Sequence, residues 1–161
     1  MKKNIFFIIL ISLLFLKCEK EETYSEIPEI NFTEFNVIEG DGSYTIANGI
    51  LTFTFVDGNG DLGYLENIDS IYDNNIEDIL LKEYFKENGE YFELKRGPYH
   101  LPYFKEGVYR KHIKGKIDIK LSRTILDSDT AYYEFYILDR AGHISNIEVT
   151  PEIIYSKLLK Q

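Results

Sequence analysis

The 161-residue sequence has one cysteine, no tryptophan and fewer basic than acidic residues. A single cysteine excludes an internal disulfide framework and a cysteine-rich zinc site. With 18 Lys and Arg against 27 Asp and Glu, the formal net charge is -9. This balance argues against a nucleic-acid partner, because phosphate backbones are bound by basic surfaces. The 44% hydrophobic residues and 13 tyrosines argue for a folded chain rather than a disordered one, and the length fits one domain.

Long apolar runs are also scarce, and the clearest one covers residues 5–16 behind the positive start Lys2-Lys3. As a helix, this run would span only ~18 Å, which is short of the ~30 Å hydrocarbon core of a bilayer. A positive start followed by a short apolar run predicts a secretory signal peptide over residues 1–17. The alternative is a buried N-terminal helix.

The only cysteine, Cys18, follows this run directly. The arrangement resembles a bacterial lipoprotein signal, in which the cysteine is lipidated and becomes the first residue of the mature chain. The run Glu19-Lys20-Glu21-Glu22 resembles the acidic export tag of surface lipoproteins of the Bacteroidetes. The resemblance implies a lipid anchor at Cys18 and a place on the outer membrane, at the cell surface or the periplasmic face. The alternative is an ordinary cleaved signal with a free thiol.

Behind the cysteine, residues 18–29 are polar and charged and predict a flexible tether. Residues 30–161 contain short segments in which apolar and polar residues alternate, typical of strands with one buried face. The clearest of these segments are Ile30–Val37, Leu51–Phe55, Ile117–Leu121, Tyr133–Ile137 and Ile147–Val149. About seven strands without a long helix predict one all-β domain, an immunoglobulin-like antiparallel β-sandwich. The tail Ile153–Leu159 fits a last strand, a short helix or a frayed end.

Two interpretations compete for the middle of the chain. Ile79–Lys86 and Glu90–Lys95 flank Asn88-Gly89. This dipeptide favours a type I′ hairpin, because both central residues of that turn need positive φ. The alternative is a helix over Asn75–Glu87, which contains strong helix formers. The hairpin is the favoured interpretation.

One loop collects side-chain oxygens at alternate positions. Asp57, Asn59 and Asp61 are separated by glycines directly after a predicted strand. Calcium binds six to eight oxygens, and glycine allows a short loop to wrap around a central ion. The loop is not an EF-hand, because the sixth and twelfth positions counted from Asp57 hold Leu62 and Ile68 instead of glycine and glutamate.

A fourth candidate ligand lies far downstream. Asp139 ends a predicted strand as Asp57 does. In an immunoglobulin-like sandwich the loop after the second strand and the loop after the sixth strand lie at the same end. This predicts a calcium site formed by Asp57, Asn59, Asp61 and Asp139. The alternative is a plain turn at residues 57–61 and a backbone cap at Asp139.

The two loops also carry a resemblance. Phe53–Gly63 follows the pattern F-x-F-x-D-G-x-G-D-x-G, and Asp139–Asn146 follows D-x-A-G-x-x-S-N. Both resemble motifs of a group of Bacteroidetes lipoproteins, and bacterial immunoglobulin-like and cadherin-like domains share the second motif. Asn59 and His143 stand where the group usually has aspartate and asparagine. The resemblance implies a fold and a location but no particular ligand.

A long irregular loop is predicted over residues 96–116, where glycines and prolines are interspersed with aromatic and basic residues. Its aromatic residues are candidates for a binding loop, because exposed tyrosines are common recognition anchors. These residues are Tyr99, Tyr103, Phe104 and Tyr109. The alternative is packing within a sheet, where tyrosine is also preferred.

The sequence contains no nucleophile elbow, no P-loop and no second cysteine for redox chemistry, and its three histidines are scattered. The predicted function is therefore non-enzymatic: a surface lipoprotein whose domain is stabilised by calcium and serves a structural role or binds an unidentified protein or glycan. One alternative is a carbohydrate-binding accessory lipoprotein of a glycan-uptake system, although tryptophan is absent. A third is a hydrolase that uses clustered carboxylates.

Overall fold

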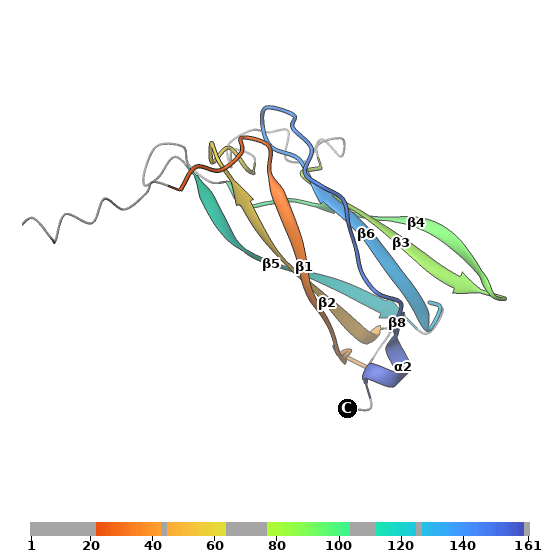
Figure 1. The fold of residues 1–161 in the computed structure, drawn as a ribbon. Coiled ribbons are helices and arrows are strands. Elements are labelled where there is room, and N and C mark those ends of the chain that lie inside the picture. Colours follow the sequence, from red (N-terminus) through yellow and green to blue (C-terminus); the bar gives the residue numbers. More distant parts are fainter. Residues whose placement is uncertain (1–21, 43–44, 64–76, 104–111, 125–126, 160–161) are drawn as a thin grey trace, which may run out of the picture.

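Two antiparallel sheets face each other in the computed structural model, which describes residues 22–42, 45–63, 77–103, 112–124 and 127–159 (Figure 1). The predicted signal peptide, Cys18, Phe104 and Tyr109 lie outside these residues. The chain is therefore an all-β sandwich, as the alternating pattern predicted.

The first sheet has the strand order β1-β2-β5, with the bounds β1 Glu29–Glu39, β2 Thr45–Asp57 and β5 Ile113–Thr124. The second sheet has the order β4-β3-β6-β7, and β8 also pairs with β6. Its strands are β3 Ile79–Glu87, β4 Glu90–Tyr99, β6 Thr130–Ile137, β7 Glu148–Val149 and β8 Ile153–Ile154. As in immunoglobulin-like sandwiches, the first, second and fifth strands share one sheet, and the third and sixth lie in the other.

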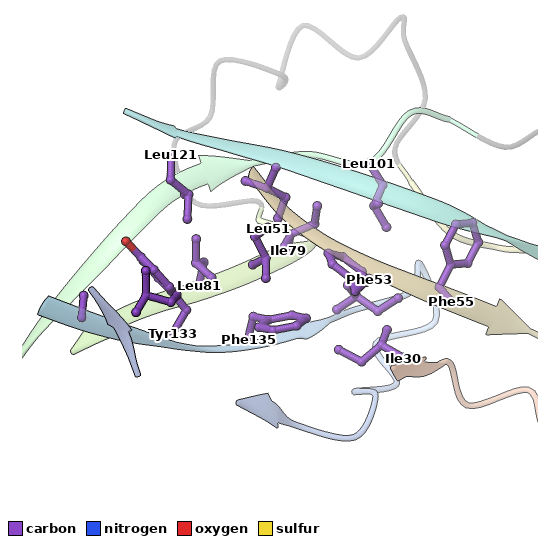
Figure 2. Close-up of a cluster of buried hydrophobic side chains, with 14 of the residues drawn as sticks. Ile30, Leu51, Phe53, Phe55, Ile79, Leu81, Leu101, Leu121, Tyr133 and Phe135 are labelled. Atoms are coloured by element: carbon purple, nitrogen blue, oxygen red, sulfur yellow. The ribbon is translucent and has the colours of Figure 1, made fainter. Parts of the chain in front are cut away.

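The core lies between the two sheets and consists mainly of residues that alternate along the strands, with Leu62, Leu101 and Tyr155 added from outside them (Figure 2). Leu51 and Phe53 of β2 are fully buried, as are Phe135 and Ile137 of β6 in the other sheet. The rings of Phe53 and Phe135 pack with their centroids 5.0 Å apart. Burying these apolar side chains is the main favourable contribution to folding.

The middle of the chain forms the predicted hairpin. β3 and β4 pair on either side of Asn88 and Gly89, whose φ angles are 50° and 89°. Two consecutive residues with positive φ are what a type I′ turn requires, and glycine adopts this conformation without steric cost. The structure is therefore a strand rather than a helix from Ile79 onward.

The predicted loop over residues 96–116 overlaps the ends of two strands, and residues 104–111 of it lie outside the described ranges. β4 extends to Tyr99, and β5 begins at Ile113 because its pairing with β2 continues to Asp57. The tail forms β8 and a four-residue helix, α2, at Tyr155–Leu158. No helix among the described residues is long and apolar enough to cross a membrane.

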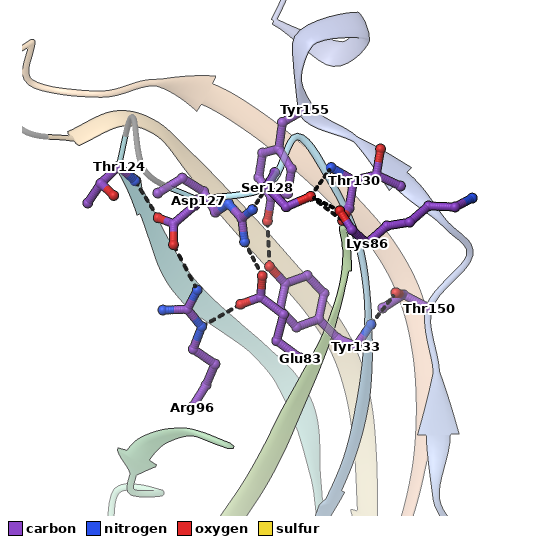
Figure 3. Close-up of polar contacts among 11 residues, drawn as sticks. Glu83, Lys86, Arg96, Thr124, Asp127, Ser128, Thr130, Tyr133, Thr150 and Tyr155 are labelled. Atoms are coloured by element: carbon purple, nitrogen blue, oxygen red, sulfur yellow. Dashed lines mark hydrogen bonds and ion pairs between the residues drawn. The ribbon is translucent and has the colours of Figure 1, made fainter. Parts of the chain in front are cut away.

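One buried cluster joins the two sheets through charge (Figure 3). Glu83 of β3 is buried and accepts hydrogen bonds from the guanidinium groups of Arg96 in β4 and Arg123 in β5. Arg123 also lies over the ring of Tyr155, 4.5 Å from the guanidinium carbon to the ring centroid. The Tyr155 hydroxyl is 2.6 Å from that of Tyr133. β3, β4, β5, β6 and α2 therefore meet at one polar cluster.

We expect Glu83→Gln to lower the free energy of unfolding by about 3–5 kcal/mol, because it leaves buried Arg123 without its carboxylate partner. Urea unfolding measures this change. Glu34→Gln is the matched control, since Glu34 forms an exposed ion pair with Lys116, and such pairs contribute little. Equal effects of the two substitutions would contradict a structural role for the Glu83 cluster.

Candidate metal centre

The loop after β2 turns tightly because of its glycines. Gly60 and Gly63 have φ angles of 73° and 76°, which L side chains rarely adopt. Gly58 has no room for a side chain, because an added Cβ would lie 2.3 Å from the carbonyl oxygen of Ser25. The backbone N–H of Gly58 donates to that same oxygen at 2.8 Å. The N-terminal segment, predicted as part of the tether, is thus held against this loop.

Three carboxylates meet at this end of the sandwich. One oxygen from each of Asp57, Asp61 and Asp139 lies within 4.8 Å of the others, and the three residues are 0%, 9% and 2% exposed. Asp57 ends β2, whereas Asp139 follows β6 of the other sheet. The backbone N–H of Arg140 donates to the carbonyl oxygen of Asp61 at 3.1 Å and ties the two loops together.

Two carboxylate oxygens in this cluster are buried without a partner. Oδ1 of Asp57 and Oδ1 of Asp61 accept no hydrogen bond from the described residues. The second oxygen of Asp57 accepts from the backbone N–H of Asp61 at 3.0 Å. Buried oxygens in native proteins almost always have a donor or a metal ion, and this cluster could hold a cation.

Asn59 has a different position from the three carboxylates. Its side-chain oxygen accepts from the backbone N–H of Asp61 at 3.4 Å, the same donor that Asp57 uses. The structure thus brings together three of the four predicted ligands, and Asn59 helps to close the turn. Both interpretations of this loop, turn and oxygen cluster, are compatible with its geometry.

Burial and mutual repulsion disfavour the charged forms of these acids. Burial, followed by the charge of Asp61, raises the pKa of Asp57 to about 6. Burial and then the charge of Asp139 raise the pKa of Asp61, which the charge of Arg140 partly offsets. Arg140 donates to the carbonyl oxygens of Leu62 and Gly63 at 2.8 and 2.7 Å, which keeps its positive charge at the edge of the cluster.

His143 orients the third carboxylate. Its ring Nδ1 lies 2.7 Å from Oδ2 of Asp139, and its backbone N–H donates to Oδ1 at 2.7 Å. The hydrogen bond to Asp139 raises the pKa of His143. His143 therefore fixes the Asp139 carboxylate, and carboxylate oxygens retain lone pairs that can bind an ion.

The predicted aromatic loop is only partly described. Tyr99 ends β4 and packs against the hydrophobic core. The ring of Tyr103 lies beneath the guanidinium of Arg140, 5.0 Å away. Phe104 and Tyr109 lie outside the described residues. The two described tyrosines therefore have packing partners within the domain.

A further buried acid, Asp78, was not identified from the sequence. Both of its carboxylate oxygens accept from the backbone N–H of Leu101 at 2.9 Å, and burial raises its pKa. Its backbone oxygen accepts from the N–H of Leu138. Asp78 thus fixes the segment after β4 beside the start of the Asp139 loop. Its position directly before the apolar strand β3 is the only sequence signal for this role.

Comparison of the chain with protein-family models, curated proteins and solved structures gave no match. The chemistry of the site therefore follows from the atoms that line it, which are the carboxylate oxygens of Asp57, Asp61 and Asp139. Carboxylate oxygens without nitrogen or sulfur ligands suit hard cations such as calcium or magnesium. Calcium is the better fit to a loop of irregular geometry, because magnesium demands near-ideal octahedral coordination.

In the cation-free protein, we expect the free energy of unfolding to fall as the pH rises from about 4 to above 6. The Asp57 carboxyl has an ordinary pKa of 3.8 and a folded-state pKa of about 6. Between these values the folded state binds more protons than the unfolded state, so a rise in pH destabilises it. The full effect is on the order of 3 kcal/mol.

Urea unfolding in the presence of a chelator, at about pH 5 and about pH 7.5, measures this dependence. Asp57→Asn has no carboxyl to titrate at this position and is expected to show a flatter profile. A profile that stays as steep in the variant as in the parent chain would assign the dependence to other groups.

Proposed function

We propose that this chain is a non-enzymatic surface lipoprotein whose β-sandwich binds calcium at one end. The observation that carries the proposal is the pair of buried, unpartnered oxygens on Asp57 and Asp61, beside the Asp139 carboxylate. A divalent cation would supply the missing positive charge and partner both oxygens. The resemblance of the Cys18 region to lipoprotein signals supports the location.

The ion would join the two sheets. Asp57 belongs to β2 of the first sheet, and Asp139 follows β6 of the second. At the opposite end, Glu83 of the second sheet already pairs with Arg123 of the first. Calcium would thus complete a second electrostatic connection between the sheets, and it would restrict the loops at its own end.

The alternative functions, carbohydrate binding and carboxylate-based hydrolysis, have no specific support among the described residues. The described tyrosines of the candidate binding loop pack against the core and against Arg140. The acidic cluster is buried, whereas a glycosidase needs two carboxylates on either side of an accessible glycosidic bond. We therefore propose that the anchored, rigid domain has a structural role or binds a partner at the cell surface.

We expect calcium to raise the melting temperature of the chelator-treated protein. An ion at 100 times its Kd that binds only the folded state stabilises it by about 2.7 kcal/mol. Asp57→Asn removes one ligand charge and is expected to abolish the shift, while the exposed Asp41→Asn retains it. Differential scanning calorimetry with and without calcium measures the effect. If the parent chain melts at the same temperature with and without calcium, the proposed calcium site is wrong.

We expect Cys18→Ser to release the protein from the membrane fraction of expressing cells, because the thioether to the lipid can no longer form. Cell fractionation followed by mass spectrometry measures both the distribution and the mass of the attached lipid. Lys20→Ser, two residues away in the acidic run, is the control and keeps the anchor. Membrane retention of the serine variant would show that the chain is held by other means.

A further inference from the structure

The strand β4 forms an open edge of the second sheet. It pairs with β3 on one side, and no strand among the described residues pairs with the other side. Phe92 and Leu94 on this strand are 45% and 41% exposed. In Figure 1 the tip of the β3–β4 hairpin projects away from the first sheet. An edge strand with exposed apolar residues is a template for pairing with another strand.

The apolar residues of β4 lie on the face of the sheet that turns toward the first sheet. Phe92 is paired with Phe85 and stacks on it at 5.8 Å, and Leu94 is paired with buried Glu83. Both side chains lie on the outermost strand of the sheet and remain exposed, although Glu83 on the neighbouring strand is buried. The β3–β4 hairpin therefore presents the apolar side chains of Phe92 and Leu94 beside the outer backbone edge of β4.

The backbone groups available at this edge follow from the hairpin register. Glu87 and Glu90 flank the two-residue turn and form the first hydrogen-bonded pair. Hydrogen-bonded and non-hydrogen-bonded pairs then alternate along the ladder. The backbone groups of Tyr91, Glu93 and Lys95 consequently point away from β3, on the side where no strand of the described ranges pairs with β4.

The charges on this edge are complementary to those of an identical strand. If two copies of β4 pair in antiparallel fashion about an axis at Leu94, Glu93 of each copy lies opposite Lys95 of the other. Axes at Glu93 or at Lys95 instead place like charges opposite each other, which destabilises the pair. Within one chain Glu93 forms an exposed ion pair with Lys82, which contributes little, and accepts a hydrogen bond from the Tyr84 hydroxyl at 2.9 Å. Lys95 pairs with Glu77, whose side chain is 12% exposed, while that of Lys95 is 63% exposed.

We propose that this protein self-associates through antiparallel pairing of β4 with β4 of a second copy, with the two-fold axis at Leu94. The pairing joins the second sheets of both copies into one continuous sheet and brings the two Leu94 side chains together. This interface is isologous, so it closes as a dimer. It uses none of the residues of the proposed cation site, so the two proposals fail independently.

Disulfide trapping tests the register directly. Side chains opposite each other in a non-hydrogen-bonded pair have Cβ atoms about 4.5–5.5 Å apart, which is close to disulfide geometry. Full-length Leu94→Cys, solubilised in detergent and oxidised, is expected to give a band at twice the chain mass on a non-reducing gel. The parent chain and the exposed β5 variant Lys120→Cys measure the background from Cys18 and from random collision.

Charge reversal provides the second arm, in the Leu94→Cys background. Glu93→Lys alone and Lys95→Glu alone place like charges opposite each other and are expected to lower the trapped fraction about fivefold or more. The double variant Glu93→Lys/Lys95→Glu restores opposite charges and is expected to recover it. Because the side chains of Glu93 and Lys95 are 48% and 63% exposed, we expect these variants to keep the fold, which circular dichroism checks.

Two results would overturn the proposal. One is a disulfide-linked fraction for Leu94→Cys that is no greater than that for Lys120→Cys. This result overturns the proposal even if light scattering detects a dimer, because that dimer would form through another surface. The other is a trapped fraction that does not respond to the single charge reversals or that the double variant fails to restore.

Discussion

A carboxylate buried between two sheets needs hydrogen-bond donors or a cation to replace the water it has lost, and this requirement shapes both ends of the sandwich. At one end Glu83 lies between the guanidinium groups of Arg96 and Arg123, so its charge is balanced within the chain. At the other end Asp57, Asp61 and Asp139 crowd together, and among the described residues Arg140 and His143 lie at the edge of the cluster. This difference between the two ends is the physical basis of the proposed ion site at the second.

Alternation of apolar and polar residues predicted the architecture well, because a strand with one buried face has to repeat every two residues. The pattern identified the inward residues of β2 and β6, and Asn88-Gly89 located the hairpin. The proximity of the Asp57 and Asp139 loops was inferred from strand order alone. Here the sequence was sufficient because local pattern and global topology agree.

The buried charged residues Glu83 and Asp78 do not follow from the sequence pattern. Glu83 lies two residues after Leu81 and therefore on the same inward face of β3. From the sequence alone, a charged residue at this position also indicates that the strand has reached solvent. The burial of Glu83 is favourable because Arg96 and Arg123 on other strands donate hydrogen bonds to its carboxylate. Asp78 likewise depends on Leu101, which is distant in sequence. Contacts of this kind depend on tertiary packing and leave no periodic signal.

The tyrosine content finds a partial explanation in the sheets rather than in the loop. Tyr84 and Tyr132 stack at 4.8 Å on neighbouring strands, and Tyr91 meets Tyr132 edge-on at 5.0 Å. Tyr133 and Tyr155 are buried beside Arg123. Cross-strand aromatic pairs stabilise sheets, so these tyrosines serve packing before recognition.

The contact between Ser25 and Gly58 fixes where the N-terminal segment leaves the sandwich, namely beside the acidic cluster. A lipid on Cys18 would be connected through a few residues, a reach of at most about 25 Å. The domain would then stand with its acidic end toward the bilayer and its hairpin tip outward. Antiparallel pairing of β4 reverses the direction of the second copy, so the two anchors would emerge from opposite ends.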